Sequence, residues 1–249
     1  MSACAFPEGA VVERLVDAAT VRVEVVELVD GRRVVRKLYS FPRLEQRLRG
    51  ASRHSWLGRP KGEREAANLE RLARGGAAVL APLGWGSRRD RLGFVRESWL
   101  VLPYLERRAT LEQILCGAAE VPGAGEEGAL WREVGVSVRR IHDLGCFYRD
   151  LRPRNLLVAP GDLRWIDASK SRWTPAPLPR PLAAEDLAGF LLPLDLAPRR
   201  AAQVWSAFRE GYCDFEDLAE LEELPRELGW GGRRRLRKCV ARERDRLRV

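Results

Sequence analysis

Three side chains with oxygen atoms suited to phosphate chemistry follow one another in the middle of the chain. Asp150 stands five residues before Asn155, and Asp167 closes a short apolar run. Carboxylate and carboxamide oxygens are hard ligands of the kind that Mg²⁺ binds, and a carboxylate beside such a site can accept the proton of an attacking hydroxyl. The order aspartate, asparagine, aspartate therefore indicates phosphoryl transfer, with Asp150 as proton acceptor and Asn155 and Asp167 as metal ligands.

The surrounding sequence predicts how these groups are brought together. Two short strand-like runs, 155–158 and 163–166, are joined by a turn at 159–162, which predicts a hairpin that returns the two metal-ligand candidates to the same end. Arg152 lies two residues after the proton acceptor, and we expect it to direct a positive charge at the transferred phosphate. The same residue pattern also arises by chance in soluble proteins, and the agreement of spacing, hairpin and preceding helix is what favours a site.

A valine-rich stretch upstream carries a candidate phosphate-binding lysine. Residues 20–25 and 33–38 alternate apolar and polar side chains around the turn signal Asp30-Gly31, which predicts a second hairpin. Lys37 lies late in the second strand, where a lysine can hold the phosphates of a nucleotide. The alternative is a solvated lysine on an edge strand. The 44 basic residues include only four lysines, so arginine would be the more common residue at such an edge position.

A helix is predicted between residues 61 and 74. Glu65, Leu69 and Leu72 recur at helical spacing, and Gly75-Gly76 is a helix stop signal. Because Glu65 borders the apolar face, we expect it to reach inward and pair with the candidate lysine.

The apolar run 99–105 is interpreted as a connection between two lobes that also binds adenine. With Leu102 as the gatekeeper residue, the backbone carbonyl of Pro103 would accept a hydrogen bond from adenine, and the missing N–H of this proline costs nothing there. Leu105 would donate its backbone N–H to adenine. An ordinary buried strand that ends in proline is the alternative.

The composition narrows the class of protein. The chain has 249 residues, enough for one sizeable domain or two lobes, and no basic start followed by a long apolar run or apolar stretch of spanning length, so we expect a cytoplasmic protein. Five scattered cysteines predict neither a disulfide framework nor a zinc site. Two histidines leave little scope for histidine-based metal or triad chemistry.

Several helices are predicted after the connection. Thr110–Gln113 has the form of a capping box that opens a helix to about Ala119. Apolar residues from Leu130 recur at helical spacing up to His142, which we interpret as a packing residue and not a catalytic one. Further on, Asp186 is predicted to open a helix through Leu191, and an apolar face at 201–212 predicts another.

The C-terminal segment Gly231–Val249 is strongly basic. It has nine basic and two acidic residues, whereas the net charge of the whole chain is +9. As a helix it would be amphipathic and suited to an anionic membrane surface. Nucleic acid is not expected, because no aromatic residues are interleaved with the arginines. A helix that pairs with the acidic stretch 214–227 is the alternative.

Together these motifs resemble the bacterial lipopolysaccharide core kinases, the Kdo and heptose kinases, over roughly residues 11 to 215. The resemblance rests on the following residues: Lys37, Arg64-Glu65 with Leu69 and Leu72, 100–106, Ile141-His142, 148–155 and Ile166-Asp167. It implies transfer of phosphate from ATP, with Mg²⁺, to a sugar hydroxyl of the lipopolysaccharide inner core. It also implies a cytoplasmic enzyme, peripheral at the cytoplasmic face of the inner membrane.

The expected fold is α+β and two-lobed, as in protein kinases, with a small β-rich lobe at 1–102 and a mainly helical lobe at 103–249 that holds the catalytic loop and the basic segment. Departures from protein kinases are Tyr148 in place of histidine, Asp167-Ala-Ser169 in place of Asp-Phe-Gly, and the absence of a glycine-rich loop at 13–23. No Ala-Pro-Glu motif follows, which favours a small or glycan acceptor. A protein or small-molecule kinase and a nucleotide-binding pseudokinase scaffold remain the alternatives.

Overall fold

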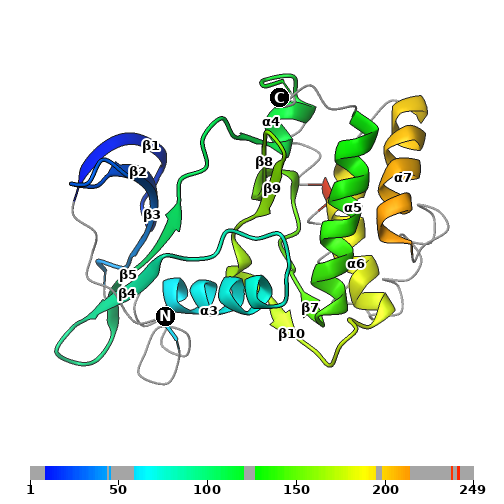
Figure 1. Cartoon of the computed structure of the whole chain (residues 1–249). Helices are drawn as coiled ribbons and strands as arrows, with labels where there is room; N and C mark the ends of the chain where they lie inside the picture. Colours follow the sequence, from blue (N-terminus) through cyan, green and yellow to red (C-terminus); the bar gives the residue numbers. More distant parts are fainter. Residues whose placement is uncertain are drawn as a thin grey trace. The chain divides into compact units, whose positions relative to one another are not determined.

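The computed structural model describes residues 9–43, 45, 59–120, 127–194, 198–213, 237, 240 and 241. The chain divides into two compact units, and we describe each by itself (Figure 1). Unit 1 comprises Met1–Ala73 and Leu80–Leu105, and unit 2 comprises Arg74–Val79 and Glu106–Val249. The chain therefore passes from one unit to the other three times.

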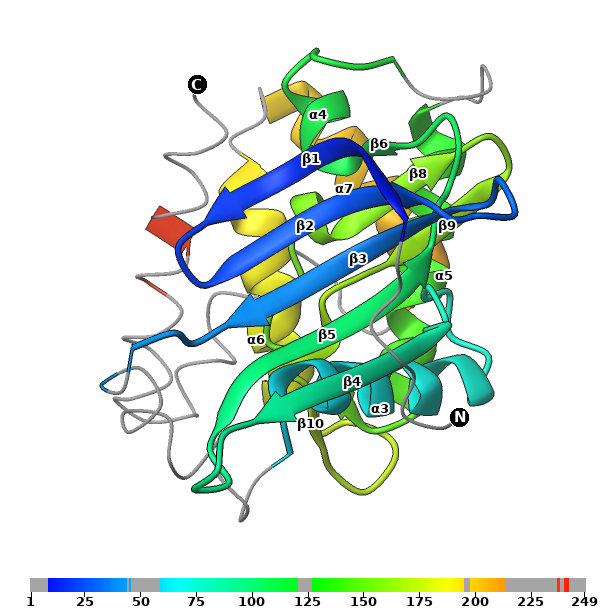
Figure 2. The same ribbon diagram turned by 90° about the vertical axis from the view of Figure 1, so that its left-hand side faces the viewer.

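Unit 1 is an antiparallel sheet of five strands in the order β1-β2-β3-β5-β4, with the helix α3 (Figure 2). The bounds of these elements are β1 Ala10–Ala18, β2 Val21–Glu27, β3 Arg33–Ser40, α3 Lys61–Arg74, β4 Gly84–Arg89 and β5 Val95–Pro103. On one face of the sheet, alternate residues of three strands form an apolar cluster. Its members are Val26, Val34, Leu38, Trp99 and Val101.

The predicted hairpin between β2 and β3 is confirmed, with Val25 opposite Val35 in its register. Gly31 at the turn has φ +78°, a left-handed conformation that glycine adopts without strain. The backbone N–H of Arg32, and then its guanidinium, donate hydrogen bonds that hold the pKa of Asp30 below its ordinary value. The turn residues Asp30 and Gly31 therefore set the register of this hairpin.

The helix α3 has the bounds that the sequence predicted. Its buried residues include Glu65, Leu69 and Leu72, so the apolar face expected from their spacing is the inward face. Gly76, at φ +78°, follows the last turn and ends the helix. The strands β4 and β5 are joined by a turn at residues 90–94, and β5 includes residues 99–103 of the run interpreted as the connection between lobes.

Unit 2 is mainly helical, with two small sheets of order β6-β8-β9 and β10-β7. Its elements are β6 Ala109–Thr110, α4 Leu111–Leu115, α5 Glu127–Asp143, β7 Cys146–Phe147, η1 Pro153–Asn155, β8 Leu156–Ala159, β9 Asp162–Trp165, η2 Ala168–Lys170, β10 Arg172–Trp173, α6 Arg180–Leu191, η3 Leu192–Leu194 and α7 Pro198–Tyr212. The predicted hairpin 155–166 is confirmed, with Leu156 opposite Trp165.

The helices α5 and α7 pack at a contact that only glycine allows. A Cβ at Gly135 would clash with the carbonyl oxygen of Phe208, and a Cβ at Gly211 would clash with that of Arg132. The two backbones therefore approach each other closely. His142, at the end of α5, is buried, and its Nδ1 lies 2.6 Å from the hydroxyl of Tyr212, which confirms its structural interpretation.

The segment Arg74–Val79 belongs to unit 2, whereas the preceding residues of α3 belong to unit 1. The guanidinium of Arg140 on α5 donates to the carbonyl of Gly75 at 2.7 Å, and the backbone N–H of Trp165 on β9 donates to the carbonyl of Ala78 at 2.8 Å. The C-terminal end of α3 is thus continuous with a segment that is fixed to two elements of unit 2.

Two predicted helix bounds are wrong. The capping box at Thr110 and Gln113 is present, but α4 ends at Leu115, because Gly117 takes φ +69°. The helix expected to open at Asp186 begins earlier, at Arg180, and the aspartate lies in its interior.

Other expectations fall partly or wholly outside the described residues. The acidic stretch 214–227 lies wholly outside them, and of the basic segment Gly231–Val249 only Arg237, Val240 and Ala241 are described. Within the described part of the chain, Cys116 and Cys213 are exposed and Cys146 is buried. No helix among those residues combines the length and the apolar character needed to cross a bilayer.

Candidate active site

The loop that follows α5 and β7 carries Asp150, and a buried carboxylate holds its backbone. Asp186 on α6 accepts hydrogen bonds from the backbone N–H groups of Tyr148 and Arg149, at 2.7 and 2.8 Å. Arg149 has φ +66°, a left-handed conformation that is costly for a residue with a side chain. The two bonds to Asp186 stabilise this conformation, which sets the position of the next residue, Asp150.

The carboxylate of Asp150 is surrounded by two cations. Lys170 Nζ lies 2.7 Å from Oδ2, and Arg154 Nη2 lies 3.5 Å from Oδ1. The Asp150 side chain is 9% exposed, whereas that of Lys170 is 57% exposed. The carboxylate is therefore held from two sides and reached by lysine from the solvent.

Main-chain hydrogen bonds hold the segments of the two metal-ligand candidates, Asn155 and Asp167, next to each other. Asn155 donates from Nδ2 to the carbonyl of Asp150 at 2.9 Å, and its own carbonyl accepts from the N–H of Ile166 at 2.9 Å. Asp167 follows directly, in a left-handed conformation, with Ser169 Oγ donating to its Oδ1 at 2.8 Å. The hairpin thus brings Asp150, Asn155 and Asp167 together, as expected from their spacing.

These residues fit a magnesium ion by their chemistry. The side-chain nitrogen of Asn155 faces the protein, which leaves its Oδ1 as the remaining side-chain atom for a cation. Among the described residues no group of three histidine, cysteine or acidic side chains forms a metal cage. One carboxylate and one carboxamide are a suitable set for Mg²⁺, which takes its other ligands from phosphate and water.

Tyr148 replaces the histidine usual in protein kinases, and the structure shows what its side chain does. Its hydroxyl donates to the carbonyl of Ile166 at 2.8 Å, directly before Asp167. Tyr148 is fully buried and its ring lies 6.1 Å from that of Trp165. The tyrosine therefore links the Asp150 loop to the residue that precedes Asp167.

The orientation expected for Arg152 is not observed. Arg152 is buried, and its Nη1 donates to the carbonyl oxygens of Leu151 and Gly189, each at 2.6 Å. Gly189 on α6 has no Cβ, and one built there would meet the guanidinium of Arg152. The side chain thus packs into the helical core, and this geometry does not support a contact with a transferred phosphate.

Unit 1 contains the expected lysine and glutamate as a pair in which the glutamate is fully buried and the lysine partly exposed. Lys37 Nζ lies 3.0 Å from Glu65 Oε1, and the hydroxyl of Tyr39 donates to Glu65 Oε2 at 2.6 Å. Lys37 and Tyr39 are two residues apart on β3 and therefore share a face of the sheet. Because Glu65 is fully buried, its two oxygens are fixed and hold the lysine in one place.

The adenine-binding candidates lie at the end of unit 1. Pro103 is the last residue of β5 and stands opposite Val34 of β3, while Leu105 follows the strand. The connection between β1 and β2 is a short turn at Ala19-Thr20 without glycine, as the sequence indicated.

The sequence analysis missed several residues that shape this site. Lys170 and Asp186 meet the Asp150 loop from positions 20 to 38 residues further along the chain, a separation at which no local pattern signals the contact. Tyr39 could have been found, because it lies two residues after Lys37 on the same strand face.

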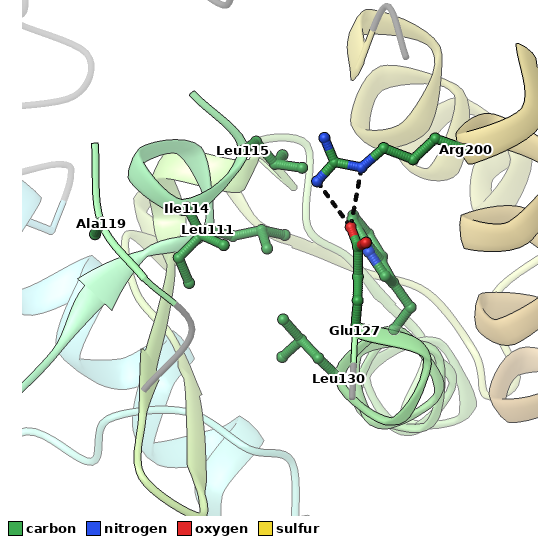
Figure 3. A pocket seen from close by; sticks show the side chains of 8 residues that line it. Leu111, Ile114, Leu115, Ala119, Glu127, Leu130 and Arg200 are labelled. Atoms are coloured by element: carbon green, nitrogen blue, oxygen red, sulfur yellow. Dashed lines mark hydrogen bonds and ion pairs between the residues drawn. The ribbon is translucent and has the colours of Figure 1, made fainter. Parts of the chain in front are cut away.

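A pocket of about 230 Å³ lies elsewhere in unit 2, between α4 and the start of α5 (Figure 3). Leu111, Ile114 and Leu130 give it an apolar lining, and an ion pair between Arg200 and Glu127, at 2.8 Å, closes one side. None of the sequence-predicted site residues lines this pocket.

Known proteins resemble this chain in family and in fold. A search of curated protein sequences finds no match. A solved structure of WaaP in complex with acyl carrier protein resembles the chain with a TM-score of 0.56 and 21% identity, over 97% of this chain and 89% of that one. The model of the lipopolysaccharide kinase (Kdo/WaaP) family matches residues 8–212. The chain therefore belongs to the lipopolysaccharide kinase (Kdo/WaaP) family.

Proposed function

We propose that this protein is an ATP-dependent kinase that phosphorylates a sugar hydroxyl of the lipopolysaccharide inner core. The observation that carries the proposal is the cluster of Asp150, Asn155 and Asp167 on one loop and hairpin. Family membership supports phosphotransfer. In this proposal unit 1 is the small lobe and unit 2 the large lobe of a protein-kinase-like fold.

Each residue has a distinct role in this reaction. Asp150 accepts the proton of the acceptor hydroxyl as its oxygen attacks the γ-phosphorus. Asn155 and Asp167 would hold Mg²⁺, which would supply positive charge to stabilise the phosphate oxygens. Lys37, fixed by Glu65, contacts the nucleotide phosphates.

Adenine recognition is assigned to the end of β5. The carbonyl of Pro103 would accept a hydrogen bond from adenine, and the N–H of Leu105 would donate one to it. Both are backbone groups at the end of a strand. The fit of a purine needs no particular side chain at these positions.

The segment after Asp167 supports a glycan or small acceptor. Only residues 174–179 separate β10 from α6, and β10 itself pairs with β7. Such a short connection lacks the length of the region with which protein kinases dock a peptide. A protein kinase is the rival of the same chemistry, and a pseudokinase scaffold is the rival without turnover.

We also propose that the enzyme is cytoplasmic and peripheral at the inner membrane, where its glycolipid acceptor is anchored. The basic segment 231–249 supports this, since each basic residue near an anionic leaflet contributes about 1 kcal/mol of attraction.

The main test combines cells and purified protein. Mass spectrometry of lipid A-core from cells with and without the gene should show the loss of one phosphate. Purified Asp150→Ala should lose transfer from MgATP to this acceptor while it still binds MgATP, because the carboxylate serves the hydroxyl and not the nucleotide. Asp162→Ala, at the first residue of β9, is the matched control and should retain activity. Near-normal turnover by Asp150→Ala would refute the assignment.

Acyl carrier protein is a second candidate partner, because the WaaP structure was solved with it. The pocket between α4 and α5 supports this, since Leu111, Ile114 and Leu130 in its lining can contact an acyl chain. Acylated carrier protein should co-elute with the enzyme, and Leu130→Glu in the pocket should abolish co-elution. Val136→Glu, on the exposed side of α5, is the control. Equal binding of carrier protein with and without an acyl chain would argue against the pocket.

A further inference from the structure

Arg152 was expected to direct a positive charge at the transferred phosphate, but its guanidinium lies elsewhere. Arg152 directs its guanidinium at the carbonyl oxygens of Leu151 and Gly189, and its side chain is buried. The attacking oxygen and the phosphoryl group meet beside the Asp150 carboxylate if this group accepts the hydroxyl proton. A negative phosphoryl group close to a carboxylate requires a positive charge between them.

Lys170 has the position that this role requires. It ends the η2 turn three residues after Asp167, and its Nζ lies 2.7 Å from Asp150 Oδ2. The side chain is 57% exposed, while that of Asp150 is 9% exposed. The ammonium thus lies on the side from which an acceptor hydroxyl reaches the carboxylate.

We propose that Lys170 is a catalytic residue that binds the transferred phosphoryl group in the transition state. The inference rests on the proposed phosphotransfer function and deepens it. The acceptor oxygen forms a bond to the γ-phosphorus as the bond from phosphorus to the β–γ bridging oxygen breaks, and ADP leaves with that electron pair. The hydroxyl proton passes to Asp150. Lys170 keeps its proton and donates hydrogen bonds both to Asp150 and to a phosphoryl oxygen.

The choice of lysine in this chain agrees with such a shared contact. The chain uses only four lysines among 44 basic residues. Lysine is a compact charge with three donors that rotate, whereas the planar guanidinium of arginine favours a fixed two-bond contact with one carboxylate. Arg154, at 3.5 Å from the other carboxylate oxygen, can hold Asp150 while Lys170 turns toward phosphate.

The first test separates the transition state from nucleotide binding. Lys170→Met should lower kcat about 100-fold, as expected for the loss of one charged contact to a developing anion, and should leave the KM for ATP within about threefold. Lys170→Arg should restore part of the loss, because it keeps the charge. Arg172→Met, which removes an exposed charge two residues further on, is the control and should leave kcat unchanged. Normal kcat in Lys170→Met would overturn the proposal.

The second test does not depend on turnover. Binding of MgADP with aluminium fluoride, which mimics the transferred group, should be at least about tenfold weaker in Lys170→Met, with MgADP alone bound as in the wild type. Equal effects on the two ligands would overturn the proposal.

A third test separates a contact with phosphate from a role exerted only through Asp150. Lys170→Met should cause a further loss of residual transfer in an Asp150→Asn background, measured with radiolabelled ATP. No further loss would show that Lys170 only positions the carboxylate, and would overturn the proposal. If the wild type does not phosphorylate core sugars but hydrolyses ATP, the proposed acceptor is wrong while the same cycle on hydrolysis still tests Lys170. If it performs neither reaction, both proposals fail.

Discussion

Asp186→Asn should weaken the anchor of the Asp150 loop without changing side-chain size. The carboxylate of Asp186 accepts from two backbone N–H groups, those of Tyr148 and Arg149, and lies 3.6 Å from the Nε2 of His142. Asparagine keeps one oxygen and turns an NH₂ group toward the second N–H, so one bond becomes neutral and the other is lost. With about 1.5–3 kcal/mol for each hydrogen bond to a charged group, we expect a loss of about 2–4 kcal/mol in the free energy of unfolding.

Amide hydrogen exchange followed by NMR measures this effect where it arises. The amides of residues 148 and 149 should exchange faster in the variant by roughly two orders of magnitude, as about 3 kcal/mol of local stabilisation implies. Urea unfolding should show a lower midpoint. Asp143→Asn, at the end of α5, is the control, because its pair with Arg139 is substantially exposed and contributes about 0–1 kcal/mol. Turnover should fall in Asp186→Asn because the left-handed residue before Asp150 is no longer held. If stability and exchange match the control, the anchoring role of Asp186 is wrong.

The other predictions concern three separate parts of the chain. Lys37→Ala and Glu65→Ala should each weaken use of MgATP, and a double-mutant cycle on kcat/KM should give a coupling of about 0.5–3 kcal/mol, while full additivity would contradict their pairing. Gly135→Ala should destabilise the protein by roughly 2 kcal/mol or more, because a Cβ there meets the backbone of α7, whereas Gly128→Ala should be neutral or stabilising in urea unfolding because its Cβ finds ordinary contact distance. Removal of residues 231–249 should release the protein from anionic vesicles in a sedimentation assay and leave ATP chemistry intact, and equal sedimentation of the full and truncated chains would refute membrane attachment by this segment.

Local patterns predicted much of the secondary structure. The helix α3 was predicted with its observed bounds because apolar spacing and a glycine pair both act within one segment. The hairpins β2–β3 and β8–β9 were predicted because turn residues stand between apolar runs. The start of α6 was missed because Pro181 made the segment look irregular, although proline is well tolerated in the first turn of a helix.

The site was predicted only in part, for a related reason. The candidates Asp150, Asn155 and Asp167 share one hairpin, so their meeting follows from local sequence. Asp186 contacts two backbone amides, and almost every residue has a backbone N–H. Residue spacing therefore cannot show which amides a buried carboxylate contacts. Arg152 was misjudged because spacing along a loop does not determine on which side of the backbone a side chain lies, and here a glycine on α6 makes room for it in the core.

The triple passage of the chain between the units has a consequence for dissecting the protein into fragments. A cut after Leu105 would look natural, yet it would leave the segment Arg74–Val79 on the wrong piece. The C-terminal fragment would then lack the carbonyl of Gly75 for Arg140 and the carbonyl of Ala78 for the N–H of Trp165. Neither half is therefore a self-sufficient building block. A split version of this protein must keep residues 74–79 on the same piece as the helical half, which no cut between Val79 and Glu106 can do.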